Sequence, residues 1–150
     1  MDIFLSQMNN LDFEKLLDSS EYKEQHRASM VTWGEQQRKT DSGYFCKQLL
    51  APGSASRKPV WIIADVRRKT DIQFFDKFTN LKLRVEASQE TRQKRNWIFI
   101  SGVDDGETEN DLDSYQKWDF VIDNDGNTEL LEKDIDRICE AIKILIKDDQ

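Results

Sequence analysis

Two adjacent arginines, Arg67 and Arg68, are the residues of this sequence best placed to bind an anion. They follow residues 60–64, a continuous apolar run that predicts a strand buried on both faces of a parallel sheet. Open α/β sheets bind ligands at the carboxyl ends of such strands. Neighbouring guanidinium groups repel each other unless an anion neutralises them, and phosphate matches the guanidinium fork. The pair therefore predicts a phosphate clamp, or else a surface pair bridged to nearby acidic residues.

A second group of cations falls on one face of a predicted helix. On a continuous helix at about 100° per residue, Lys23, Arg27 and Arg38 lie within roughly 60° of one another. Like charges at this spacing are mildly unfavourable, which favours a partner anion. Glu24 and Glu35 can supply the negative charge from within the same helix, so a solvated charged face is the alternative interpretation.

Arg92 and Arg95 form a third basic group, in a predicted helix over residues 88–95. Such a group is typical either of a basic lid over a ligand or of an exposed charged helix. The whole chain is acidic, with 22 basic and 29 acidic residues and a formal charge of −7, which argues against nucleic acid or anionic lipid as the main partner. Three basic groups on an acidic protein therefore predict a small polyanionic ligand.

The remaining composition limits the class of protein. A chain of 150 residues fits one compact domain, which predicts a single domain over residues 1–150. Two cysteines, Cys46 and Cys139, are typical of a reduced intracellular protein and argue against a structural disulfide. His26 is the sole histidine, so a zinc site with several His ligands is excluded. Residues 1–8 do not form a signal peptide and no later stretch is long and apolar enough to span a bilayer, so we expect a cytoplasmic protein without a membrane partner.

Apolar periodicity and turn residues predict an α/β fold with a parallel sheet. We expect helices over residues 9–17, 18–39, 44–50, 71–78, 88–95 and 129–147, and strands over residues 60–64, 83–87 and 120–122. Ala51-Pro-Gly53 predicts a turn, and the acidic residues 104–113 predict a loop.

Two segments imitate ligand-binding loops, but their residues do not have the spacing that such loops require. Residues 123–126 with Glu132 imitate a calcium loop, but the first ligand position would be Val121 and a strand, not a helix, precedes it. Residues 53–58 imitate a phosphate loop, yet they lack its second glycine and precede a strand. The 150 residues contain no Gly-x-x-x-x-Gly-Lys-Ser/Thr motif, and we expect no metal site built by the protein alone.

In their order along the chain, several short motifs resemble those of animal-type phosphomevalonate kinase. They are Leu16-Leu-Asp18-Ser-Ser-Glu-Tyr22-Lys-Glu24, Trp33-Gly-Glu35 with Arg38, Phe45-Cys46, Asp65-Val-Arg67-Arg68 with Asp71-Ile-Gln73, residues 92–97, Gly102-Val-Asp-Asp105 and Val121-Ile-Asp-Asn124. The resemblance covers nearly the whole chain, and the shared order of the motifs makes it specific.

The resemblance implies a three-layer, P-loop kinase-like fold of the nucleoside-monophosphate-kinase type, with a parallel sheet flanked by helices. It also implies a reaction in which ATP, accompanied by Mg²⁺, gives its γ-phosphoryl group to (R)-5-phosphomevalonate in the mevalonate route to isoprenoids and sterols. Catalysis in such an enzyme consists largely of positioning and charge neutralisation.

The resemblance assigns roles to individual residues of this chain. Arg67 and Arg68 would hold the acceptor phosphate and the charge of the moving phosphoryl group. The implied contacts with the substrate are Lys23, Arg27, Arg38 and Asn124, and those with the nucleotide are Arg92, Arg95 and Asp125. Asp125 and Asp134 differ from the residues that the family pattern leads us to expect at those positions. Fold analogy also makes Asp65 a candidate to orient a water bound to Mg²⁺.

In the family, a strand, the Gly-rich phosphate loop, a helix and a second strand precede the position of Met1. The first of these strands is expected between the strands that begin at Val60 and Leu83. Because residues 1–150 lack the phosphate loop, we expect them to be inactive alone. We also expect the complete enzyme to be a monomer. Two alternatives stay open, which are a non-catalytic short form that binds a partner and a kinase of similar fold for nucleoside monophosphates.

Overall fold

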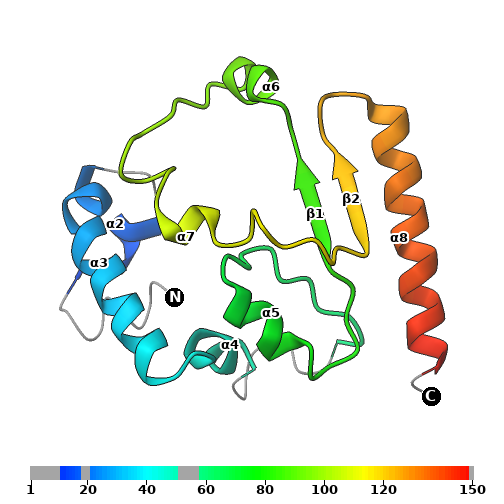
Figure 1. Cartoon of the computed structure of the whole chain (residues 1–150), viewed down its shortest axis with the longest axis horizontal. Coiled ribbons are helices and arrows are strands. Elements are labelled where there is room, and N and C mark those ends of the chain that lie inside the picture. The colour runs from blue at the N-terminus through cyan, green and yellow to red at the C-terminus, as the bar shows by residue number, and fades with distance from the viewer. Residues whose placement is uncertain (1–10, 18–20, 51–57, 149–150) are drawn as a thin grey trace. The chain divides into compact units, whose positions relative to one another are not determined.

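The computed structural model describes residues 11–17, 21–50 and 58–148 (Figure 1). Residues 1–56 and residues 57–150 form two compact units. The turn expected at Ala51-Pro-Gly53 and the first residues of the helix expected over 18–39 lie outside the described residues.

The first unit is helical and consists of α2 (Phe13–Leu17), α3 (Glu21–Thr40) and α4 (Tyr44–Leu49). The predicted helices over residues 18–39 and 44–50 are confirmed, and the first predicted helix is shorter than expected. Leu16 of α2 and Cys46 of α4 are buried. Helix α3 contacts both of the other helices, so it is the element around which this unit packs.

Aromatic rings join α3 to α4. Trp33 makes edge-on contacts with Tyr44 and Phe45, whose ring centroids lie 6.1 and 5.9 Å from its own. Within α3, the rings of Tyr22 and His26 also meet edge-on, with centroids 4.7 Å apart. Edge-to-face pairs at these distances stabilise helix packing beyond the area that they bury.

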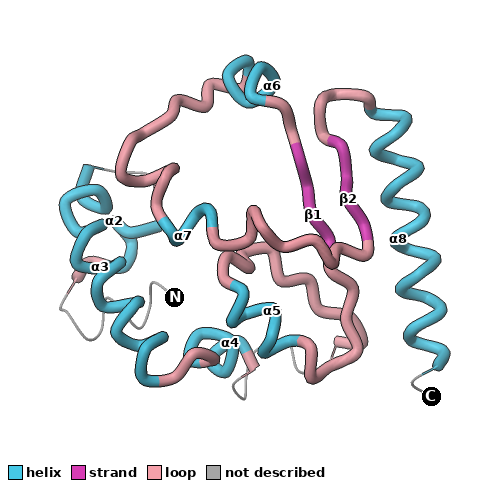
Figure 2. The backbone as a smooth tube through the Cα atoms, viewed as in Figure 1, coloured by secondary structure: helices cyan, strands magenta, loops and turns pink. Residues whose placement is uncertain are grey.

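The second unit has an α/β order, α5 (Lys69–Phe75), β1 (Leu83–Glu86), α6 (Gln89–Lys94), α7 (Glu107–Asn110), β2 (Phe120–Asp123) and α8 (Thr128–Asp148). The two strands pair in parallel, with Leu83 opposite Phe120 and Glu86 opposite Asp123 (Figure 2). The strands predicted near residues 83–87 and 120–122 are therefore confirmed, as are a mixed α/β fold and the helices at residues 88–95 and 129–147.

Helix α8 covers β2 (Figure 1). Ile122 of the strand and Ile138 of the helix are both buried. The Arg137 guanidinium lies 5.8 Å from the centre of the Phe120 ring, so the long side chain of a charged residue covers the strand's other inward side chain. Because paired residues of a parallel sheet share a face, Val85 lies on the same face as Ile122, yet its side chain is exposed.

The strand predicted over residues 60–64 is wrong. The run has no regular secondary structure and forms no ladder with either strand of the described chain, and Ile62 is 87% exposed. A strand needs a hydrogen-bonded neighbour, and an apolar run by itself supplies none. Arg67 and Arg68 therefore follow an irregular segment instead of the carboxyl end of a strand.

Two further expectations need correction. The helix predicted over residues 71–78 begins at Lys69 and ends at Phe75, because the Asp71 carboxylate accepts the backbone N–H of Arg68 at 3.2 Å and so starts the helix earlier. The acidic loop predicted over residues 104–113 contains the short helix α7.

Candidate functional site

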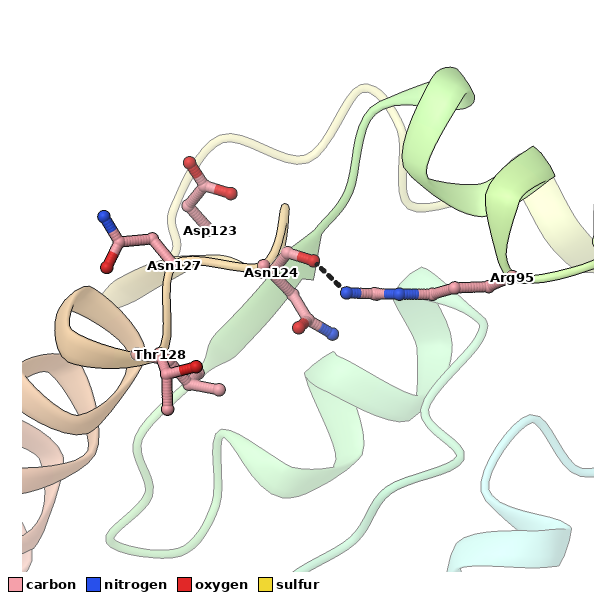
Figure 3. Close-up of a pocket in the computed structure, with 7 residues that line it drawn as sticks. Arg95, Asp123, Asn124, Asn127 and Thr128 are labelled. Carbon is pink, nitrogen blue, oxygen red and sulfur yellow. Dashed lines mark hydrogen bonds between the residues drawn. The ribbon is translucent and has the colours of Figure 1, made fainter.

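A cavity of about 170 Å³ lies at the carboxyl end of β2 (Figure 3). Its lining comes from the end of α6, the loop after β2 and the start of α8, namely Arg95, Asp123, Asn124, Gly126, Asn127, Thr128 and Leu131. The carboxyl end of parallel strands is the usual place for a ligand in an open α/β sheet. Arg95 and Asn124, which the family resemblance makes contacts of the nucleotide and the substrate, both line this cavity.

Arg95 connects α6 to the loop after β2. It is the residue that follows α6, and its Nη2 donates a hydrogen bond to the backbone carbonyl oxygen of Asn124 at 2.8 Å (Figure 3). Ser88 caps the other end of α6, where its hydroxyl accepts the backbone N–H of Thr91 at 3.2 Å. The short helix is thus held at both ends, which directs a guanidinium group into the cavity.

Side-chain caps shape the loop between β2 and α8. Asp123 Oδ1 accepts the backbone N–H of Asp125 at 2.8 Å, and Asn127 Oδ1 accepts that of Leu130 at 3.1 Å as α8 begins. Between them Gly126 has φ of +107°, a conformation that other residues rarely adopt. These local contacts present the Asn124 side of the loop to the cavity.

Asp125 does not line the cavity. Its Oδ1 accepts the backbone N–H of Ser88 at 2.7 Å, which joins the loop after β2 to the N-cap of α6. That bond, together with a hydrogen bond from Thr91 and the charge of Arg95, lowers the pKa of the Asp125 carboxyl. Asp134, the other departure from the family pattern, pairs with Arg137 at 3.1 Å on α8.

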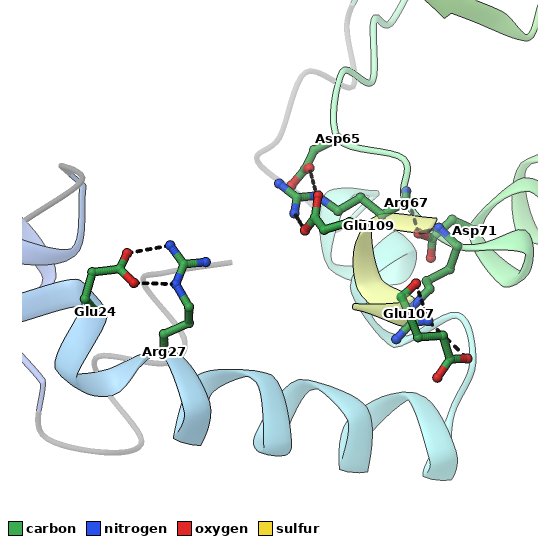
Figure 4. A network of polar contacts seen from close by, with 8 residues as sticks. Glu24, Arg27, Asp65, Arg67, Asp71, Glu107 and Glu109 are labelled. Carbon is green, nitrogen blue, oxygen red and sulfur yellow. Dashed lines mark hydrogen bonds and ion pairs between the residues drawn. The ribbon is translucent and has the colours of Figure 1, made fainter. Parts of the chain in front are cut away.

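Arg67 is held between two carboxylates (Figure 4). Its Nε donates to Asp65 Oδ1 at 2.6 Å and its Nη1 to Glu109 Oε1 at 2.5 Å. The hydrogen bond to Asp65 and the charge of both acids raise the pKa of Arg67. Acidic neighbours therefore neutralise this guanidinium, as the alternative interpretation of the sequence expected.

Arg68 is buried, unlike its neighbour. Its Nη1 donates to the backbone carbonyl of Glu107 at 3.0 Å and lies 3.3 Å from Glu107 Oε1. Its backbone N–H bonds to Asp71 Oδ2 at 3.2 Å, and that of Arg67 bonds to the same oxygen at 3.4 Å. The buried Asp71 thus fixes the backbone of both arginines. Neither arginine lines the cavity at Asn124.

The remaining basic candidates make local contacts. On α3, Arg27 makes a two-point ion pair with Glu24 at 2.7 and 2.5 Å (Figure 4). The bond from Arg27 lowers the Glu24 pKa. Arg38 of α3 lies 4.9 Å from the centre of the Phe45 ring, and Arg92 of α6 lies 4.8 Å from that of Trp97.

Lys23 is half-buried on α3. It shares this helix with Arg27 and Arg38, so all three belong to the first unit, and the pocket that they are expected to share with Arg67 stays a prediction.

Sequence reasoning did not single out the acidic residues that face residues 67–69. Glu107, Glu109 and Asp111 alternate along one short segment, and each contacts one of these three basic residues. The alternation of acidic residues in the sequence was the available signal.

In residues 11–17, 21–50 and 58–148, no group of three or more His, Cys, Asp or Glu side chains is arranged to hold a metal ion. Within the same part of the chain, no helix combines the length and the apolar character that crossing a membrane requires.

A cavity lined by an arginine at the carboxyl edge of parallel strands is typical of α/β proteins that bind phosphorylated small molecules. Known proteins identify the class more narrowly. A family model described as phosphomevalonate kinase matches residues 4–81. A Drosophila melanogaster protein named phosphomevalonate kinase is 35% identical over 140 residues, which cover 89% of this chain and 73% of that protein.

The chain therefore belongs to the phosphomevalonate kinase family. Family membership confirms the predicted class of enzyme, a kinase that uses ATP, and places the chain in the mevalonate route to isoprenoids. It does not favour the alternatives of a non-catalytic binding protein or a nucleoside-monophosphate kinase.

Proposed function

We propose that the protein transfers the γ-phosphoryl group of ATP to (R)-5-phosphomevalonate through two basic sites of its second unit. Arg95 and Asn124 form the cavity side of the site, where Arg95 contacts the nucleotide and Asn124 the substrate. Arg67 and Arg68 bind the acceptor phosphate and neutralise charge on the moving phosphoryl group. The observation that carries the proposal is the cavity at the carboxyl end of β2, into which Arg95 brings a positive charge.

The remaining features follow the resemblance. We place these residues in one domain with a three-layer, P-loop kinase-like sheet, and we propose a monomer in the cytoplasm. Lys23, Arg27 and Arg38 line the acceptor side, and Arg92 assists Arg95 at the nucleotide.

Mg²⁺ enters with the nucleotide. Asp65, the candidate to orient a water on the ion, bonds to Arg67 at 2.6 Å. Mg²⁺ commonly binds through substrate phosphates with one or two carboxylates. When bound, the ion neutralises charge on the phosphates.

The acceptor is tested on the complete enzyme by ADP release from ATP, with (R)-5-phosphomevalonate compared with a panel of nucleoside monophosphates. We expect ADP only with phosphomevalonate. Binding of each acceptor is measured by titration calorimetry on the same protein, so that recognition can be judged apart from turnover. Preferential binding of a nucleoside monophosphate would contradict the proposal.

A further inference from the structure

Three consecutive basic residues face three acidic residues that are spaced two apart. The side-chain contacts are Arg68 Nη1 to Glu107 Oε1 at 3.3 Å, Arg67 Nη1 to Glu109 Oε1 at 2.5 Å, and Lys69 Nζ to Asp111 Oδ1 at 3.6 Å. We call residues 107–111 the acidic strap. Arg67 and Glu109 are 42 residues apart in the sequence, so this pairing is a tertiary contact and not a local one.

Backbone groups anchor both ends of the acidic strap. The carbonyl oxygen of Glu107 accepts a hydrogen bond from Arg68 at 3.0 Å, and Asp111 Oδ2 accepts the backbone N–H of Lys69 at 2.9 Å. The Arg68 side chain is only 7% exposed, whereas the Glu107 side chain is 82% exposed. The first anchor therefore depends on the Glu107 carbonyl more than on its carboxylate.

The central contact is of a different kind. The side chains of Arg67 and Glu109 are 52% and 35% exposed, and pairs with such access to water are individually weak. Phosphate oxygens are strong acceptors for a guanidinium group. A phosphate can therefore replace the Glu109 carboxylate on Arg67 while both anchors of the strap stay in place.

We propose that Glu109 is the resting counter-ion of Arg67 and is exchanged for the phosphate of the acceptor when it binds. The inference rests on the proposed function, in which Arg67 binds that phosphate. The exchange has a consequence for specificity. Mevalonate carries a hydroxyl group where (R)-5-phosphomevalonate carries its phosphate, so only the phosphorylated acceptor brings an anion that can displace Glu109 from Arg67.

The test measures the dissociation constant of (R)-5-phosphomevalonate by titration calorimetry, with mevalonate as the unphosphorylated comparison. Glu109→Gln keeps the shape of the side chain and removes the competing charge. We expect phosphomevalonate to bind about two- to fivefold tighter to this variant, the range that corresponds to an exposed ion pair. Mevalonate has no phosphate to compete with Glu109, so its affinity should stay nearly the same and the preference for phosphomevalonate should rise.

Glu140→Gln is the matched control, because it removes one charge from an exposed pair with Lys143 on α8. It should leave the affinity unchanged. When Arg67 is already replaced by Met, adding Glu109→Gln should not change the affinity for phosphomevalonate. The guanidinium group for which the phosphate and the Glu109 carboxylate compete is then absent.

A second measurement does not depend on a variant. During titration of the unaltered protein, the carboxyl ¹³C signal of Glu109 should shift while that of Glu107 stays in place. Unchanged affinity in Glu109→Gln, an equal gain in Glu140→Gln, or a static Glu109 signal on binding would each overturn the exchange and leave the proposed function intact. No binding of phosphomevalonate to the unaltered protein would overturn both.

Discussion

The Arg95 guanidinium and the Asn124 carbonyl oxygen, 2.8 Å apart, join the end of α6 to the loop that follows β2. One hydrogen bond thus connects the two segments that contribute most of the cavity at the carboxyl end of the sheet. A cation held in this way is already directed toward a ligand before the ligand arrives, which reduces the ordering cost of binding.

Replacement of Arg95 tests its role at the nucleotide. Arg95→Met should weaken ATP binding by about 1.5–3 kcal/mol, the usual contribution of a hydrogen bond to a charged group. Titration calorimetry measures the change. The control is Lys94→Met, one residue earlier, whose ammonium pairs with Glu90 at 2.7 Å on the surface of α6. Equal losses in the two variants would mean that α6 contributes only general charge.

The two adjacent arginines should respond differently to the same substitution. In the active enzyme, Arg67→Met and Arg68→Met should each cost about 2–4 kcal/mol of transition-state stabilisation, measured as the change in kcat/KM. Arg68→Met should also lower the free energy of unfolding by about 1–3 kcal/mol, because it removes the hydrogen bond from a buried, charged guanidinium to the Glu107 carbonyl. Arg67→Met should hardly change it, since its ion pairs are exposed.

Thermal melts of both variants separate the roles of the two arginines. If neither substitution changed the rate, both residues would be structural. Equal destabilisation by the two substitutions would contradict the difference in burial.

Asp125 should make the stability of the second unit sensitive to acid. Its pKa is lowered in the folded chain, chiefly by the N–H of Ser88, so its contribution is fully present above the ordinary Asp pKa of about 3.9. As the pH falls below that value, the unfolded chain binds a proton first and the contribution is lost progressively. The Asp125→Asn variant should therefore be less stable than the unaltered protein at neutral pH. Its free energy of unfolding should also fall less between pH 5 and roughly pH 2–3.

Urea unfolding at several pH values measures this difference. Asp136→Asn is a suitable control, since Asp136 is an exposed carboxylate of α8. An identical pH dependence in the unaltered protein and in Asp125→Asn would show that the bond to Ser88 does not form in solution.

Residues 60–64 should exchange their amide hydrogens quickly. Ile62 and Ile63 belong to an irregular run without a ladder in the described chain, whereas Ile138 is buried in the middle of α8. Hydrogen exchange followed by NMR should give weak protection at the first two residues and strong protection at Ile138. Val85, exposed on the β1 face, should also be weakly protected. Strong protection at Ile62 and Ile63 would indicate that a strand pairs with them.

Local patterns in the sequence were sufficient for many elements. The periodicity of residues 18–39 and 129–147 predicted α3 and α8, because helical spacing is a property of neighbouring residues. The apolar stretches at β1 and β2 predicted a parallel pair, and the order of short motifs predicted the family. The family pattern assigned Arg95 to the nucleotide and Asn124 to the substrate, but it did not predict that the Arg95 side chain bonds to the Asn124 carbonyl oxygen.

Tertiary structure alone decided the environment of the remaining candidates. Spacing along the chain does not show that Glu109 neutralises Arg67, that the Glu107 carbonyl holds Arg68, or that Asp125 faces Ser88, since these partners are 37 to 42 residues apart. The same is true of residues 60–64, whose composition predicted a strand. A strand and an ion pair each need a partner from elsewhere in the chain, so the residue types determine what can form and the packing determines what does form.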